Sequence, residues 1–84
     1  MFRIDQWREG PKTVVKAQGR LDGPLVAVLE GVLAAAGPAN TVIFELASLS
    51  HADSAGLAVL RAAIGEGAQV RSVSWFVAGL LGPS

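Results

Sequence analysis

The chain has no cysteine among its 84 residues, which excludes disulfides and thiolate metal sites. Charge is also scarce, because only 17% of the residues are charged against about 25% in typical domains. Long hydrophobic runs are missing as well, since no apolar stretch approaches the roughly 18 residues that span a bilayer. The first residues carry charge where a signal peptide would have its apolar core. We therefore expect a cytoplasmic protein without direct membrane insertion.

Neither sign of charge predominates, because seven basic and seven acidic side chains cancel. The nearest approach to a basic cluster is Lys12, Lys16 and Arg20, which share one strand-like segment with apolar residues. This pattern is typical of an edge strand kept soluble by its charges. Binding to nucleic acid needs clustered Lys or Arg, so we expect no nucleic-acid partner.

The length predicts a single domain, residues 1–84. Its hydrophobic share is 51%, so some apolar surface must stay outside on so small a body. Such surface often marks a partner site. The equally weighted alternative is a helix-covered sheet with alanines facing solvent.

Alternating polar and apolar residues predict a strand over Phe2–Trp7, and β-branched residues predict another over Thr13–Gln18. The Gly-Pro turn within Glu9–Lys12 should join them as a hairpin at one side of a sheet. The nearly unbroken hydrophobic run Thr41–Leu46 predicts a central strand covered on both faces. A short strand is expected over Gln69–Val73.

Helices are predicted between these strands. The first starts at Asp22-Gly23-Pro24, where Asp22 or Gly23 can cap and Pro24 suits the first helical position. It runs to about Ala36 with an apolar face formed by Leu25, Val28, Leu29, Val32 and Leu33. The second runs from Ser54 to about Gly65 with Leu57, Leu60 and Ile64 inward, and a short apolar one covers Trp75–Leu81. The order β-β-α-β-α-β-α predicts an α/β fold with a small mixed, mainly parallel sheet covered by helices.

Residues 50–54 pack serine, histidine and aspartate together, but they do not predict an enzyme. A catalytic triad usually joins residues from separate segments, and Ala52 stands where a nucleophile elbow has its first glycine. His51 is the only histidine, so a histidine-pair metal site is excluded, and it should be a partly exposed loop residue. No Gly-rich phosphate motif surrounds Asp22 or Asp53. We expect no catalytic residue, no metal and no cofactor, although both aspartates should fall at one rim of the sheet, where open α/β sheets bind ligands.

Ser54 has two interpretations. Its hydroxyl could cap the second helix by accepting from an N–H two or three residues on. Alternatively, it could face solvent as a modification target, where a phosphate would be tolerated because a helix N-terminus favours negative charge. Phosphorylation would then change the surface beside Asp53 without a change of fold.

Several segments resemble a known family. Gln18-Gly19-Arg20-Leu21-Asp22 looks like the Gly-x-Leu-Asp of the STAS domain (sulfate transporter and anti-sigma factor antagonist), and residues 42–49 resemble its central strand and following loop. Residues 53–60, Asp-Ser-Ala-Gly-Leu-Ala-Val-Leu, look like its signature, and residues 67–71 are similar to its next glycine-led strand. Two departures stand out: Glu45 replaces the aspartate of many members, and the chain ends before a further strand and helix. This shortening would leave one sheet edge or the Trp75-Phe76 region less covered, and a homodimer or a permanent partner would hide it.

The resemblance implies a bacterial regulatory module of transcription, an anti-sigma factor antagonist whose partner anti-sigma kinase phosphorylates Ser54. The unphosphorylated domain would bind that kinase through the rim residues Asp22, Asp53, Ser54, Ala55, Gly56 and Leu57. The chain would be substrate and ligand, not enzyme.

The resemblance also implies an alternative. STAS proteins similar to this one are subunits of bacterial ABC lipid-transport systems, where they sit on the cytoplasmic side of the permease. Residues 51–58 look at least as much like that group. Low charge and an apolar C-terminus fit a stable subunit somewhat better than a switching one, and we rank the sigma-pathway role slightly ahead.

Overall fold

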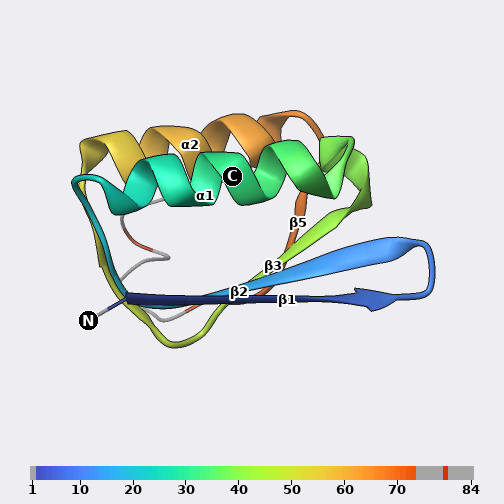
Figure 1. Ribbon diagram of the computed structural model, residues 1–84, viewed down its shortest axis with the longest axis horizontal. Helices are drawn as coiled ribbons and strands as arrows, with labels where there is room; N and C mark the ends of the chain where they lie inside the picture. The colour runs from blue at the N-terminus through green and yellow to red at the C-terminus, as the bar shows by residue number, and fades with distance from the viewer. Residues whose placement is uncertain (1, 74–78, 80–84) are drawn as a thin grey trace.

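The computed structural model describes residues 2–73 and residue 79 (Figure 1). The predicted helix at Trp75–Leu81 therefore lies, apart from Gly79, outside the described residues. Within residues 2–73 the elements follow in the order β1 (Phe2–Glu9), β2 (Lys12–Leu21), α1 (Leu25–Ala36), the short 3-10 helix η1 (Ala39–Thr41), β3 (Val42–Leu46), β4 (Leu49–Ala52), α2 (Ser54–Gly65) and β5 (Gln69–Val73). This is a small α/β arrangement, as the alternation of strand and helix patterns predicts.

The predicted hairpin is confirmed, with longer strands than the sequence pattern indicates. β1 pairs antiparallel with β2 from Phe2 opposite Gly19 to Glu9 opposite Lys12. Only Gly10 and Pro11 connect the strands, and Gly10 has a φ of 62°. A two-residue hairpin turn needs a positive φ at its first position, which glycine adopts without strain.

The sheet has the strand order β1-β2-β3-β5, with β4 also paired to β2. β2 pairs in parallel with β3 along its first half and with β4 along its last residues, and β3 pairs in parallel with β5. β2 is thus an interior strand, so the prediction of an edge strand at Lys12, Lys16 and Arg20 is wrong. On this interior strand Lys12 and Lys16 are half-buried and Arg20 is exposed.

Both described helices lie on the same face of the sheet (Figure 1). The chain steps from β2 to β3 and from β3 to β5 in one direction across the sheet, and right-handed crossovers then place each connecting helix on one side. Among the described elements, helices cover the predicted Thr41–Leu46 strand on one face only (Figure 1). Val42, Phe44 and Leu46 are buried, whereas Ile43 and Glu45 on the other face are half-buried.

The core lies between the helices and this face. Its fully buried side chains include Leu21, Leu29, Phe44, Leu49 and Leu60. The predicted apolar face of α1 is corrected in one place, because Val28 is 50% exposed whereas Val26 is buried. On α2, Leu60 is buried and the predicted inward residues Leu57 and Ile64 pack against the core.

The strand β4 was not predicted, because residues 47–52 were interpreted as the loop that follows the central strand. Ala47 and Ser48 form a turn after β3, and β4 then pairs with β2 on the side that β3 also occupies. In this turn the Ser48 carbonyl accepts from the Gly19 N–H (3.0 Å). None of the helices in residues 2–73 has the length and hydrophobicity needed to cross a bilayer.

Candidate functional site

The segments before α1 and α2 meet at one rim of the sheet. Ala52 at the end of β4 is the parallel partner of Leu21 at the end of β2. The next residue, Asp53, donates its backbone N–H to the Leu21 carbonyl (3.0 Å). The two chain segments that were predicted to share a rim are thus held side by side.

Asp53 is the cap of α2. Its Oδ1 accepts from the Gly56 N–H (2.8 Å), and its Oδ2 accepts from the Gly23 N–H (3.1 Å). The carboxylate therefore joins the start of α2 to the turn before α1. The hydrogen bonds from Gly56 and then Gly23 lower the pKa of Asp53, and the nearby His51 lowers it further.

Ser54 is the first residue of α2 and is exposed. Because Asp53 occupies the cap, the Ser54 hydroxyl does not perform the capping role that was one of its two interpretations. Within the described part of the chain it makes no side-chain hydrogen bond. Its oxygen therefore stands in solvent at the positive end of a helix dipole.

The next three residues differ in their surroundings. Ala55 is exposed, Leu57 is half-buried against the core, and Gly56 is buried. A Cβ at Gly56 would lie 3.0 Å from both the Cγ and the carbonyl oxygen of Leu21. Gly56 thus lets α2 approach β2 closely, and it can contribute to a partner surface only by positioning its neighbours.

Asp22 lies on the same rim but does not cap α1. The residue before α1 is Pro24, without a side-chain cap, and the Leu25 N–H donates to the Asp22 carbonyl (3.1 Å). A backbone turn therefore replaces the predicted cap by Asp22 or Gly23, and Pro24 precedes the first helical residue. The half-buried Asp22 side chain forms an ion pair with Arg20, with 3.5 Å between Oδ2 and Nε.

The polar residues of β4 lie in different surroundings. The Ser50 hydroxyl donates to the Gly19 carbonyl (2.9 Å). His51 is half-buried and belongs to a strand, so the prediction of a loop histidine is wrong in its placement. No cluster of three or more His, Asp or Glu side chains suited to a metal ion occurs among the described residues.

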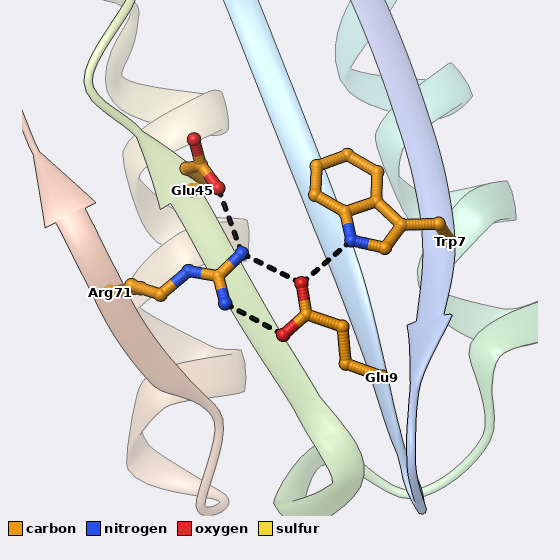
Figure 2. Close-up of polar contacts among 4 residues, drawn as sticks. All are labelled: Trp7, Glu9, Glu45 and Arg71. Carbon is orange, nitrogen blue, oxygen red and sulfur yellow. Dashed lines mark hydrogen bonds and ion pairs between the residues drawn. The ribbon is translucent and has the colours of Figure 1, made fainter.

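A second polar cluster, which the sequence did not predict, lies on the sheet face away from the helices (Figure 2). Arg71 donates from Nη1 to Glu9 Oε1 (2.8 Å) and from Nη2 to Glu45 Oε2 (2.9 Å). The Trp7 indole donates to Glu9 Oε2 (2.8 Å). Arg71, followed by Trp7, lowers the pKa of Glu9, and Glu9 and Glu45 raise the pKa of Arg71.

Arg71 connects strands from opposite edges of the sheet, since Glu9 belongs to β1 and Arg71 to β5. The two residues are 62 positions apart in the chain. No local pattern joins residues at that separation, and only the strand order brings them together. Glu45 of β3 also belongs to this cluster.

No family model matches the sequence, and no curated protein is significantly similar to it. The resemblance to the STAS domain therefore stays a prediction, carried by the residues named above.

Proposed function

We propose that this protein is a STAS-like, non-enzymatic protein-binding module in which Ser54 is a phosphoacceptor. The observation that carries the proposal is the exposed Ser54 hydroxyl, which does not act as a helix cap because Asp53 supplies the cap of α2. The partner is an anti-sigma factor kinase, which binds the rim of Asp22, Asp53, Ser54 and Ala55 and whose active site activates the attacking hydroxyl.

Phosphorylation acts through charge in this proposal. A phosphate adds nearly two negative charges next to the Asp53 carboxylate. Since the Ser54 hydroxyl holds no fold-stabilising hydrogen bond among the described residues, the fold needs no rearrangement to accept the phosphate. A partner that covers the rim would have to desolvate or repel these charges, and it would be released.

The test is binding of Ser54 variants to the anti-sigma kinase encoded nearest to this gene. We expect the kinase with ATP to modify Ser54, as mapped by mass spectrometry. Ser54→Ala should keep binding and lose modification, whereas Ser54→Asp should lose binding. The free energy of unfolding of both variants should lie within about 0.5 kcal/mol of that of the parent, as is usual for substitutions at exposed positions. Undiminished binding by Ser54→Asp would contradict the switch.

The alternative function is a subunit of an ABC-type phospholipid-transport complex that binds the permease on its cytoplasmic side. It is favoured by the outer surface of the helices, where Val28 is 50% exposed and most of its exposed neighbours are alanine or glycine. If this alternative holds, the chain should copurify with a permease and its ATPase, and Ser54→Ala should have almost no effect on that complex or its activity. The genes beside this one also discriminate, because a kinase and sigma factor support one role and a permease the other.

A further inference from the structure

A groove lies between the two helices, toward their C-terminal halves and away from Ser54. Its volume is about 340 Å³, within the range of about 300–1,000 Å³ that is usual for binding pockets. Its apolar lining includes Leu33, Val42, Val59 and Ala62, and the lining also includes Glu30 and Glu66. None of the rim residues Asp22, Asp53, Ser54 and Ala55 lines the groove, so the groove and the rim share no residue.

The charge at this groove is negative. Among the described residues, its lining contains the carboxylates of Glu30 and Glu66 and no lysine or arginine. α1 and α2 run in the same direction (Figure 1), so the negative ends of both helix dipoles lie at this end of the layer. Neither helix has a basic residue in its last turn. The Lys12 ammonium donates to the Asn40 carbonyl (2.8 Å), and Lys12 does not line the groove.

We propose that this groove binds a basic amphipathic helix of a partner protein, which inserts an aliphatic side chain between α1 and α2. The apolar floor takes the aliphatic side chain, and lysines or arginines one turn away on either side meet Glu30 and Glu66. An acidic or uncharged helix would bury or oppose the carboxylates without compensation, which costs free energy. The proposal does not depend on the role of Ser54.

A second copy of this chain fits the groove less well. The exposed residues of α1 include one charge, Glu30, and no basic residue. On α2, Arg61 is exposed beside Ala58, Ala62 and Gly65, none of which offers a long aliphatic side chain. The described helices therefore do not present the combination that the groove selects.

The experiment titrates the isotope-labelled protein with a 14-residue helical peptide of leucine and lysine, followed by amide chemical shifts. The control peptide has glutamate in place of each lysine. We expect the lysine peptide to shift the amides of Leu33, Val59 and Ala62, and the glutamate peptide to leave them unchanged. Binding should weaken as NaCl is raised from 0.15 to 0.5 M, because salt screens exposed charges.

Three variants test the assignment to this groove. Glu30→Gln and Glu66→Gln should each weaken binding about two- to five-fold, as the loss of one exposed charge pair does. Asp5→Asn removes the same charge from β1 and should leave binding unchanged. Ala62→Leu fills the groove and should weaken binding of the lysine peptide while the far-ultraviolet circular dichroism stays that of the parent.

Four results would overturn the proposal: no binding of the lysine peptide, equal binding of both peptides, shifts confined to the Ser54 rim, or equal losses in Asp5→Asn and Glu30→Gln. Shifts of the groove amides with protein concentration alone would also overturn it, because they would identify the groove as a dimer face.

Discussion

Because the Asp53 side chain caps α2, the neighbouring Ser54 hydroxyl is not needed as a cap. Both Asp53 and Ser54 are good helix caps by residue type, so the sequence could not decide between them. The structure starts α2 at Ser54, which makes Asp53 the cap and leaves the serine hydroxyl in solvent. The choice depends on two hydrogen bonds to another part of the chain: the Asp53 N–H donates to the Leu21 carbonyl, and the Asp53 carboxylate accepts from the Gly23 N–H.

Two substitutions at Asp53 should distinguish how much each of its two side-chain hydrogen bonds contributes to stability. Asp53→Ala loses both the Gly56 and the Gly23 contacts and should lower the Tm clearly. Asp53→Ser can still cap Gly56 but cannot reach Gly23 with a second oxygen, so its Tm should fall between that of Asp53→Ala and the parent. Thermal unfolding followed by circular dichroism measures both. Equal Tm values for Asp53→Ser and Asp53→Ala would mean that the cap contributes nothing.

The stability that Asp53 contributes should depend on pH in one direction. Its pKa is lowered in the folded state, so the folded protein keeps the carboxylate charged where the unfolded chain begins to bind a proton. The contribution is fully present above the ordinary aspartate pKa of about 3.9 and is lost as the pH falls through the lowered value. In Asp53→Asn this part of the acid dependence should disappear, as measured by urea unfolding between pH 2 and pH 6.

The glycines of the two helices allow a matched comparison of close and open packing. Gly56→Ala places a methyl group 3.0 Å from the Leu21 carbonyl oxygen, a contact that only a backbone shift can relieve. We expect a loss of about 1–3 kcal/mol, the usual cost of overpacking. Gly31→Ala meets nothing within 4 Å, so it should stabilise by up to about 1 kcal/mol through helix propensity. Urea unfolding of the two variants tests the pair, and a stabilised Gly56→Ala would show that α2 can move away from β2.

The elements themselves were largely predictable from the sequence. Hydrophobic periodicity and turn residues located α1, α2, β5 and the hairpin within a few residues, because these features depend on neighbouring positions. β4 escaped prediction because it is defined by its pairing with β2, about 30 residues earlier in the chain, which no local pattern shows. Val28 was misplaced because periodicity alone does not fix which edge of a helical stripe faces the core.

The cluster of Glu9, Arg71 and Glu45 acts at the scale of the whole sheet. It joins β1 to β5 and β3 on the face without described helices (Figure 2). Arg71→Met should lower the Tm more than Arg3→Met, because within the described part of the chain Arg3 pairs with Asp5 alone, two residues away in its own strand (3.0 Å). The difference should shrink in 0.5 M NaCl, since these side chains are partly exposed. Equal Tm losses for the two variants would contradict this role.

The same cluster predicts a titration. Arg71 holds the pKa of Glu9 below its ordinary value, so the carboxylate supports stability at neutral pH and ceases to do so as the pH falls through that lowered pKa. In Arg71→Met the Glu9 pKa should rise toward the ordinary value of a glutamate, as followed by carboxyl chemical shifts. An unchanged Glu9 midpoint would mean that the contact with Trp7 alone sets it.

The position of β2 has a consequence for fragments of this protein. β2 has β1 on one side and both β3 and β4 on the other. Its last residue, Leu21, accepts a hydrogen bond from the Asp53 N–H and packs closely against Gly56, and these two residues flank Ser54 and Ala55. A synthetic peptide of residues 49–65 would lack these contacts with β2, so it would have the same sequence without the same conformation. Amide exchange should accordingly be slowest along β2, and a kinase or antibody that reads the corner by shape should ignore the peptide.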